Sequence, residues 1–403
     1  MGLIVQKFGG SSVKDAERMA NVARIITEMY SKGNNIVVVL SAQGDTTDDL
    51  IAKAVEINPD YSKRELDMLM ATGEQISVAL CAMAIERLGF PVISLNSCQI
   101  GIETDSTYGN SRIKRIDTER LHAELDKKNI VLVTGFQGIN RYGDFTTLGR
   151  GGSDTSAVAL AAVLKADLCQ IYTDVDGIYT GDPRIVPNAT KIDEITYDEM
   201  LELASLGAQV LHNRSVEMAK RYGVNMEVLS SLTNNPGTIV KEVVKNMEKV
   251  NVSGVARDNN VARIALVGLK DQPGVAFRVF SLLAGKHVNI DIILQSIGRD
   301  DTKDISFTLA KTHLKEAIEV LETNKDNLGY KELTVDDHVS KVSIVGAGMV
   351  NNAGVASSMF EALYNAGINI QMISTSEIKI SVLIDAADSD SAIKAVHDKF
   401  FSM

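Results

Sequence analysis

Apolar residues follow two different patterns along roughly the first 235 positions of the chain. Six short runs are almost continuously apolar and rich in β-branched residues, as expected of strands buried on both faces of a sheet. Longer stretches between them carry apolar residues at helical spacing. This alternation predicts an α/β domain in three layers, a mainly parallel sheet with helices on both faces. The predicted strands are 3–6, 35–40, 91–95, 130–135, 168–173 and 226–229, and the predicted helices are 15–31, 63–88, 118–127, 153–165 and 196–222.

The C-terminal part contains an internal repeat. The run Gly-Val-Ala at 274–276 recurs at 354–356, and Asn-Ile at 289–290 recurs at 369–370, at a constant offset of 80 residues. Each copy reads as strand, loop, helix, strand, strand and helix, the order of a split βαβ module. A chance likeness between two amphipathic helices would not also reproduce the helix start and the strand start in register. The sequence therefore predicts two tandem ferredoxin-like α+β modules.

These patterns divide the 403 residues into three domains. An Asn-Asn-Pro-Gly turn at 234–237 precedes a charged stretch and marks the first boundary. We expect a catalytic domain over 1–240 and a first small module over 262–335. The second module is expected to combine 251–261 with 336–403, because the segment after 251 can supply an extra strand.

Composition narrows the class of protein. A net charge of −11, with 45% hydrophobic and 23% charged residues, indicates a globular chain and argues against nucleic acid or an anionic membrane as partner. The apolar runs 36–40 and 157–164 are much shorter than the roughly 20 residues that span a bilayer. No export signal is visible, and Cys81, Cys98 and Cys169 are widely spaced, so we expect a reduced, cytoplasmic protein. The six scattered histidines do not suggest a metal site.

The first predicted strand runs directly into glycines, in the order Lys7, Phe8, Gly9 and Gly10. Glycines let backbone amides approach an anion closely, and a following helix N-terminus adds partial positive charge. Lys7 would then neutralise charge on a transferring phosphoryl group. The alternative is an ordinary strand–turn–helix connection with a surface lysine. Neither a Walker A pattern nor GxGxxG occurs, which excludes the usual P-loop and dinucleotide-binding sites.

Two further polar segments follow or enter apolar elements. Residues 41–48, which include Ser41 and Thr47, come directly after the second strand, where open α/β sheets bind ligands. A solvated turn that caps a helix is the alternative. Glu74, in Thr-Gly-Glu at 72–74, lies in an otherwise apolar helix. Its carboxylate would suit an ammonium group, and the alternative is a glutamate on the helix surface.

The segment 147–156 has three glycines in four positions and leads into a helix of small apolar residues. Such a helix is buried, so its N-terminus points into a confined polar site. Arg150 would hold a carboxylate or phosphate through two parallel hydrogen bonds. Asp154 would orient a nucleophile or bind magnesium. A simple N-cap by Ser153 or Asp154 is the alternative, but it explains neither Arg150 nor the glycines.

The segment 172–184 follows another buried strand and contains Thr173, Asp174, Tyr179 and Arg184. An aromatic ring and an arginine among turn residues suit the edge of an adenine-ribose group and its phosphates. A purely structural turn is the alternative. The closing glutamate of an EF-hand is missing, which excludes that calcium site.

Together, the five segments and the repeat resemble the aspartate kinases of the amino acid kinase family, which carry two C-terminal ACT modules. The likeness extends over essentially the whole chain. It implies ATP-dependent phosphorylation of the side-chain carboxylate of L-aspartate, giving 4-phospho-L-aspartate and ADP, with Mg²⁺ bridging the β- and γ-phosphates. A carboxylate is nucleophilic at pH 7, so such catalysis needs positioning and charge neutralisation rather than a strong base.

The resemblance also implies a role for individual residues. The implied catalytic residues are Lys7 and Asp154. The implied ATP-binding residues are Lys7, Phe8, Gly9, Gly10, Ser41, Ser153, Thr173, Asp174, Tyr179 and Arg184. The implied substrate-binding residues are Thr47, Glu74 for the ammonium group, Arg150 for the α-carboxylate, and Gly151, Gly152 and Ser153.

By the same resemblance, the ACT modules bind lysine and/or threonine as feedback effectors, in pockets formed where two modules associate. A homo-oligomer is therefore expected. The implied effector residues are Asp271, Gly274, Val275, Asn289, Ile290 and Gln295, with Asn369 and Ile370 as their counterparts in the second copy.

Three positions depart from the family pattern. Gln209 and Asn213 stand where many relatives have lysine and proline, so no nucleotide-directed positive charge is assigned to Gln209. Gln43 stands where methionine is usual. Two other functions stay open: a kinase for another amino-acid carboxylate such as glutamate, and a catalytically inactive amino-acid sensor.

Overall fold

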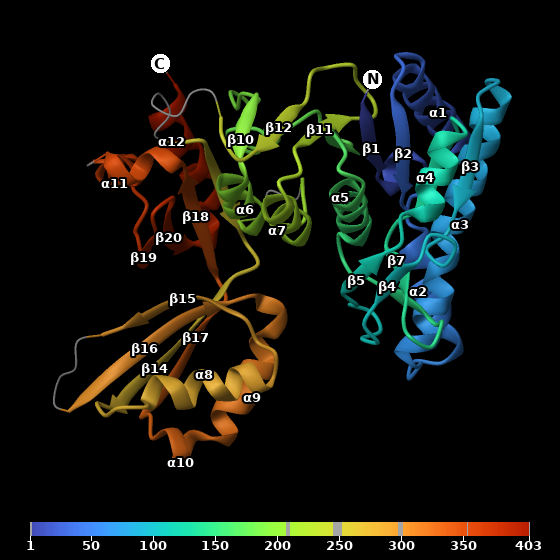
Figure 1. Ribbon diagram of the computed structural model, residues 1–403. Helices are drawn as coiled ribbons and strands as arrows, with labels where there is room; N and C mark the ends of the chain where they lie inside the picture. The colour runs from blue at the N-terminus through green and yellow to red at the C-terminus, as the bar shows by residue number, and fades with distance from the viewer. Residues whose placement is uncertain (1, 207–209, 245–251, 297–300, 353, 403) are drawn as a thin grey trace. The chain divides into compact units, whose positions relative to one another are not determined.

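The computed structural model divides the chain into two compact units, and each is described by itself (Figure 1). The first unit consists of Met1–Tyr179 and Lys191–Asn246. The second consists of Thr180–Thr190 and Met247–Met403. The residues described by the structure are 2–206, 210–244, 252–296, 301–352 and 354–402.

An eight-stranded sheet forms the centre of the first unit. Its strands are β1 (Leu3–Phe8), β2 (Asn35–Leu40), β3 (Val92–Leu95), β6 (Ile130–Thr134), β9 (Leu168–Thr173), β10 (Glu194–Thr196), β11 (Met226–Ser230) and β12 (Thr238–Lys241). Their order is β10-β12-β11-β9-β1-β2-β6-β3, and every pair is parallel except β11 with β12. The six predicted strands are all present, and the mainly parallel sheet is confirmed.

Helices cover both faces of this sheet, which gives the predicted three layers (Figure 1). Alternate residues of β2 point to opposite faces. Ile36 and Val38 pack in one core with α1 and α3, whereas Val39 lies on the face of α5. All residues of α5 from Gly152 to Ala161 are buried, as its small apolar composition predicts. The helices are α1 (Ala16–Ser31), α2 (Thr46–Ile57), α3 (Lys63–Arg87), α4 (Glu119–Asp126), α5 (Gly152–Leu164), α6 (Tyr197–Ser205) and α7 (Asn213–Tyr222).

The structure adds elements that the sequence pattern did not predict. A small second sheet consists of β4 (Ile102–Thr104), β5 (Ile113–Ile116), β7 (Gln137–Ile139) and β8 (Phe145–Thr147), in the order β5-β4-β7-β8. Strands of three or four residues are too short to show a period. The polar segment after β2 opens helix α2, and the predicted helix 196–222 is two helices, α6 and α7.

The second unit contains the two predicted repeats, each a helix-covered antiparallel sheet. The first repeat runs β14 (Ala262–Lys270), α8 (Val275–Gly285), β15 (Ile290–Gln295), β16 (Thr302–Leu309), α9 (Leu314–Thr323), α10 (Lys325–Leu328) and β17 (Glu332–Asp336). The second runs β18 (Val339–Val345), α11 (Val355–Asn365), β19 (Met372–Thr375), β20 (Lys379–Asp385) and α12 (Ser389–Phe401).

The two repeats complete their sheets differently. The fourth strand of the first sheet is β17, which follows its helices and pairs with β14. The fourth strand of the second sheet is β13 (Gly254–Asp258), which precedes the first repeat and pairs with β18. The strand expected within 251–257 is therefore β13. The first repeat is thus inserted between two parts of the second.

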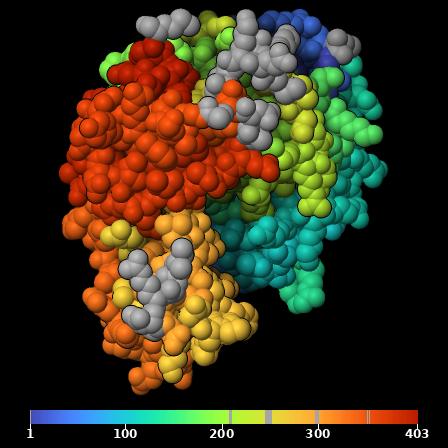
Figure 2. All heavy atoms as spheres, turned by 90° about the vertical axis from the view of Figure 1, so that its left-hand side faces the viewer, coloured from blue at the N-terminus to red at the C-terminus, as the bar shows by residue number. Residues whose placement is uncertain are grey.

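The two repeats also pack against each other within this unit. Ile292 of β15 shares a small core with Val339, Met372 and Leu383 of the second repeat. Lys341, with a side chain only 5% exposed, forms an ion pair with Asp291 of β15. In Figure 2 the red surface of the second repeat adjoins the orange surface of the first.

Among the residues that the structure describes, one helix is long and apolar enough, by length and composition alone, to cross a membrane. This helix is α3, and half of its most apolar window is buried inside the fold. It packs against α1, α2, β3 and β8. A core helix of a globular domain passes the same test.

Candidate active site

The carboxyl ends of four parallel strands place the predicted segments at one edge of the large sheet. Lys7, near the end of β1, is in register with Val39 of β2 and Ile171 of β9. The next residues continue this alignment: Ser41 N donates to Phe8 O at 3.1 Å. At the end of β6, Gly135 N donates to Leu40 O at 3.0 Å. Open parallel sheets bind their ligands at this edge.

Glycine is needed where the loop after β1 meets the loop after β2. A Cβ atom on Gly10 would lie 2.7 Å from Ala42 O and 3.1 Å from Gly44 O. The backbones also bond directly, because Gly44 N donates to Gly10 O at 3.0 Å. The side chain of Phe8 is buried and stacks on Tyr172, with ring centroids 4.4 Å apart. The glycine loop is therefore held firmly over the sheet edge.

Lys7 and Asp154 form the central ion pair of this edge. Lys7 Nζ lies 2.7 Å from Asp154 Oδ1, and both side chains are 12% exposed. Asp154 lies in the first turn of α5 and does not cap it, since the residue before the helix is Gly151 in the left-handed conformation. Removing two charges from water cancels most of their attraction, so this pair is weak evidence for stability. It does fix an ammonium group at the end of β1.

Glu74 lies on the buried side of α3, which rules out the surface-glutamate alternative. The residue is 2% exposed, and its Oε1 accepts a hydrogen bond from Ala42 N at 3.2 Å. Its Oε2 has no hydrogen-bond partner among the described residues. Burial raises the pKa of this carboxyl group to about 7. A buried carboxylate oxygen without a donor is suited to a cationic ligand.

The loop that carries Arg150 is shaped by glycines. Gly149 and Gly151 have φ angles of +77° and +66°, and Arg150 between them is exposed. A Cβ atom on Gly151 would lie 2.3 Å from the side chain of His212. Ser153, 8% exposed, approaches Gly135, where a Cβ atom would lie 2.7 Å from its Oγ. The structure therefore brings the 147–156 segment to the same sheet edge as Lys7.

The predicted nucleotide segment is divided between the two units. Thr173 donates to Asp174 Oδ1 at 3.0 Å, and Tyr179 donates to Asp176 Oδ1 at 2.7 Å, all within the first unit. Arg184 belongs to the second unit, where its Nε and Nη2 bind the carboxylate of Asp182 at 2.9 and 2.8 Å.

The remaining first-unit positions fall on several elements. Thr47 is half-buried in the first turn of α2. Gln43 donates through Nε2 to Val13 O at 2.8 Å, so it serves the loop structure. Asn213 opens α7 and donates to Ser205 Oγ at 2.7 Å. Gln209 lies outside the described residues.

The predicted effector residues lie at both ends of the first repeat. Asp271 and Gly274 follow the end of β14, and Asp271 forms an ion pair with Lys303. Asn289 and Ile290 lie at the other end, because Ile290 is opposite Leu309, which is opposite Ala262 at the start of β14. Val275 is buried at the start of α8, and Gln295 ends β15. In the second repeat, Asn369 is exposed and Ile370 is half-buried.

Sequence reasoning missed two residues that hold the Arg150 loop, Asp67 and Arg214. Asp67 is fully buried and bonds to Gly109 and Thr147. Arg214 donates to the backbone oxygens of Leu148 and Ser111. A signal for Asp67 was available, because it lies seven residues before Glu74 and so on the same face of α3.

Comparison with known proteins agrees with this geometry. The sequence profile of the amino acid kinase family matches residues 2–230, and that of the ACT domain matches residues 264–324 and 342–400. An aspartokinase of Mycolicibacterium smegmatis is 51% identical over 405 residues, covering 99% of this chain and 96% of that protein. One from a Bacillus species, strain MGA3, is 48% identical over 400 residues, covering 99% and 97%.

Solved structures give the same answer. Aspartokinase III of Escherichia coli, in complex with aspartate and ADP, matches with a TM-score of 0.84 and 25% identity, covering 99% of this chain and 100% of that one. An aspartate kinase from Synechocystis is 45% identical with a TM-score of 0.57, covering 99% of this chain and 69% of that one. The expected fold and the expected kinase class are confirmed. The chain belongs to the amino acid kinase family, among its aspartokinases with tandem ACT domains.

Proposed function

We propose that this kinase transfers the γ-phosphoryl group of ATP to the side-chain carboxylate of L-aspartate, giving 4-phospho-L-aspartate and ADP. The observation that carries the proposal is the placement of Lys7 and Asp154 at the sheet edge where the glycine loops meet. The E. coli relative was solved with aspartate and ADP, which supports the same pair of ligands here.

The phosphates of ATP fit the loop between β1 and α1. Gly9 and Gly10 would line the phosphates: a Cβ atom on Gly9 would lie 3.4 Å from Lys7 Nζ, and Gly10 lets this loop pack on the loop after β2. Ser41 adds a hydroxyl group, and the first turn of α5 contributes partial positive charge. Lys7 supplies the full positive charge. The nucleoside part would contact Thr173, Asp174 and Tyr179, with Arg184 as the fourth proposed residue.

Magnesium is expected to arrive on the phosphates. Within the described residues, no group of three or more His, Cys, Asp or Glu side chains could hold a metal ion. Mg²⁺ typically binds one or two carboxylates and several phosphate oxygens. Asp154, which forms an ion pair with Lys7, is the carboxylate that would contact the ion. Bound there, the ion would neutralise charge on the β- and γ-phosphates.

L-Aspartate carries one ammonium group and two carboxylates, and the site offers partners for each. Glu74, with its unpaired Oε2, would take the ammonium group. Arg150 would take the α-carboxylate, beside the backbone amides of Gly151 and Gly152. Ser153 and Asp154 would orient the reacting end, and Thr47 would line the substrate from α2. Glutamate has the same groups but one more methylene between its α-carbon and its side-chain carboxylate. The distances from Lys7 to Glu74 and to Arg150 would therefore decide whether aspartate or glutamate is phosphorylated.

In the proposed step, a side-chain carboxylate oxygen of aspartate attacks the γ-phosphorus. The bond from that phosphorus to the β–γ bridging oxygen breaks, and ADP leaves with the electron pair. No proton is removed from the nucleophile, so no general base is required. Lys7 balances the charge that develops on the transferring group.

Feedback control by lysine and/or threonine is proposed for the ACT modules. E. coli aspartokinase III was also solved with lysine and aspartate. Asp271 and Gly274 lie at the opposite end of the first repeat from Asn289 and Ile290. One repeat alone therefore does not gather the predicted set, which favours pockets formed between modules of a homo-oligomer. Val275, Gln295, Asn369 and Ile370 complete the proposed effector set.

The proposed domain limits are those expected from the sequence, 1–240, 262–335, and 251–261 with 336–403. A cytoplasmic location is part of the same proposal.

The test is formation of a hydroxylamine-trapped acyl phosphate from ATP, Mg²⁺ and L-aspartate. We expect product with aspartate and much less with glutamate. Product with glutamate alone would replace the proposed substrate, and no product with any amino acid would favour the inactive-sensor alternative. Repeating the assay with lysine, with threonine and with both identifies the effector.

A further inference from the structure

We propose that Asp67 is a positioning residue that holds the loop 147–151, and with it Arg150, at a fixed place relative to Glu74. This inference rests on the proposed roles of Arg150 and Glu74 in binding the amino-acid substrate. It concerns a residue that lies outside the predicted site and acts through Thr147.

Asp67 reaches the loop from helix α3, the same helix that carries Glu74. Its Oδ2 accepts hydrogen bonds from Thr147 N and from Gly109 N, both at 2.9 Å. Its Oδ1 accepts one from Thr147 Oγ1 at 2.8 Å. Thr147 ends β8, three residues before Arg150. The carboxylate of Asp67 therefore joins α3, the helix that carries Glu74, to the loop 147–151, which carries Arg150.

The opposite side of the loop is held by Arg214 of α7. Its Nη1 donates to Leu148 O and its Nη2 to Ser111 O, both at 2.8 Å. Ser111 in turn bonds to Thr147 O through its backbone nitrogen at 2.8 Å and its hydroxyl at 3.0 Å. The loop is thus held by two side chains from two helices, Asp67 from α3 and Arg214 from α7. Of these two helices, α3 is the one that also carries Glu74.

The burial of Asp67 indicates why a carboxylate stands there. The residue is fully buried, and burial raises its pKa while the three hydrogen bonds oppose that shift. A buried carboxylate costs free energy that an apolar side chain of similar size would not. A fully bonded polar group does, however, select one arrangement of the irregular backbone around it. Loop position, rather than stability, is the property that this arrangement favours.

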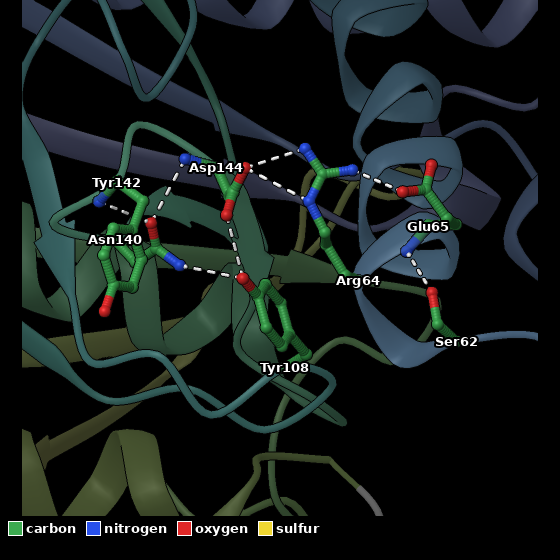
Figure 3. Close-up of polar contacts among 7 residues, drawn as sticks. All are labelled: Ser62, Arg64, Glu65, Tyr108, Asn140, Tyr142 and Asp144. Carbon is green, nitrogen blue, oxygen red and sulfur yellow. Dashed lines mark hydrogen bonds and ion pairs between the residues drawn. The ribbon is translucent and has the colours of Figure 1, made fainter.

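A second, less deeply buried cluster links the same helix to the loops that contain Tyr108 and Asp144, and it serves as an internal comparison (Figure 3). Arg64, at the start of α3, donates to Asp144 Oδ1 from Nη2 at 2.8 Å, and Tyr108 donates to Asp144 Oδ2 at 2.9 Å. Tyr108 also accepts from Asn140 at 3.2 Å. The ion pair of Arg64 with Asp144 is partly exposed to water, and ion pairs of this kind contribute little. If any tether between α3 and the loops sufficed, removal of Asp144 would have the same effect as removal of Asp67.

The test compares steady-state kinetics of Asp67→Ala, Asp67→Asn and Thr147→Val. In Asp67→Ala the KM for aspartate should rise about tenfold or more, because small displacements of substrate-binding groups are costly, while the KM for ATP stays about the same. Asp67→Asn should restore most of the wild-type KM. Its amide oxygen can accept from both backbone donors, and its amide nitrogen can donate to Thr147 Oγ1. Thr147→Val, which removes one of the three bonds, should fall between them.

Two control variants separate positioning from general damage. Asp144→Ala removes the partly exposed tether from Arg64, and Glu124→Ala removes a buried carboxylate whose bonds stay near α4, to Lys127 and Asn129. Both should keep the wild-type KM for aspartate. A purely structural role for Asp67 would lower kcat or thermal stability in the same way as Glu124→Ala, with KM unchanged, and would overturn the proposal.

Hydrogen exchange provides a readout that does not depend on the substrate. Amides of the segment 147–151 should exchange faster in Asp67→Ala than in Glu124→Ala, and unchanged exchange would also overturn the proposal. If the wild type phosphorylates a different amino acid, the substrate assignment is wrong and the same kinetic comparison applies to that amino acid, because every amino acid presents an α-carboxylate to Arg150.

Discussion

The hydroxyl oxygen of Thr180 lies 2.9 Å from His397 Nε2, and both groups are buried. Thr180 begins the segment Thr180–Thr190, which belongs to the second unit although its first residues lie within the predicted nucleotide segment 172–184. Val186 of the same segment is fully buried in the core of the second repeat. The chain therefore leaves the first unit after Tyr179, contributes Val186 to the core of the second repeat, and returns to the first unit at Lys191.

His397 should make the second unit sensitive to acid. Its ring is fully buried and stacks on Phe401, its Nδ1 has no hydrogen-bond partner among the described residues, and burial lowers its pKa below 6.5 while nearby Asp398 opposes the shift. The folded chain thus favours the neutral ring. As pH falls through 6.5 the unfolded chain takes up a proton first, so stability is lost below that pH.

The measurement is thermal unfolding of wild type, His397→Gln and His338→Gln between about pH 7.5 and pH 5.5. Glutamine can bond to Thr180 but does not titrate, so His397→Gln should lose less stability on acidification than wild type. His338 has an exposed side chain and its variant should follow the wild type. Equal pH dependence in all three proteins would show that His397 is not the titrating group.

Replacing Lys7 by alanine should reduce kcat for acyl phosphate formation by about 100-fold or more, because a preorganised positive charge at the transferring group is lost. The KM for aspartate should change little, since Glu74 and Arg150 remain. Lys14→Ala is the matched control, an exposed lysine on the same loop, and should keep full activity. A small loss in Lys7→Ala would mean that another cation carries this role.

Glu74→Gln should move substrate affinity and stability in opposite directions. The folded pKa of about 7 exceeds the ordinary value of 4.5, so the unfolded carboxyl group ionises first as pH rises. The free energy of unfolding therefore falls as the pH rises from 4.5 to about 7. At pH 8 the full loss, up to about 3 kcal/mol, is present. Glutamine removes that cost, and urea unfolding at pH 8 should show a more stable protein.

The same variant should raise the KM for aspartate about tenfold or more, because a charged hydrogen bond to the ammonium group is lost. In wild type, kcat/KM for aspartate should fall as pH drops below about 7, where Glu74 takes up a proton. That inflection should be absent from the variant. Glu65→Gln, at an exposed position of the same helix, should leave both KM and stability near wild type.

Gly151→Ala and Gly143→Ala form a pair that separates backbone strain from a clash. Both glycines have positive φ, +66° and +80°, so alanine costs about 1 kcal/mol at either position. No atom of the described residues lies within 4 Å of a Cβ atom on Gly143, whereas one on Gly151 would meet His212 at 2.3 Å. Only Gly151→Ala should therefore raise the KM for aspartate as well, since the Arg150 loop must move. Equal effects would show that the contact with His212 is unimportant.

Much of the fold could be predicted because its elements have strong local signals. Continuous apolar runs such as 35–40 identify strands covered on both faces, and the Gly-Val-Ala and Asn-Ile repeats identify two copies of one module. The small sheet formed by β4, β5, β7 and β8 could not be predicted, because strands as short as Ile102–Thr104 have no detectable period. Its existence depends on packing against α3 rather than on local propensity.

The candidate site shows the same limit at the level of single residues. Lys7 and Arg150 stand in glycine-rich segments that signal a ligand, whereas the signal for Asp67 is only its place on the same face of α3 as Glu74. The burial of Glu74 also depends on the rotation of α3 about its own axis, which directs Glu74 toward the loop after β2. Helical spacing in the sequence does not determine that rotation. Thr173 and Arg184 stand in one segment of the sequence, and the structure assigns them to different units, a division that the sequence pattern does not show.

The position of β13 and Val186 has a consequence for synthesis of the chain. Both are made before the first repeat, whereas the partners that bury them, β18 and α12, are made after it. During translation, β13 has an unpaired edge and Val186 is exposed to water until β18 and α12 have been made. A chain that lacks α12 would therefore expose apolar residues such as Val186 to water. Loss of this helix would change the structure about 200 residues earlier in the sequence.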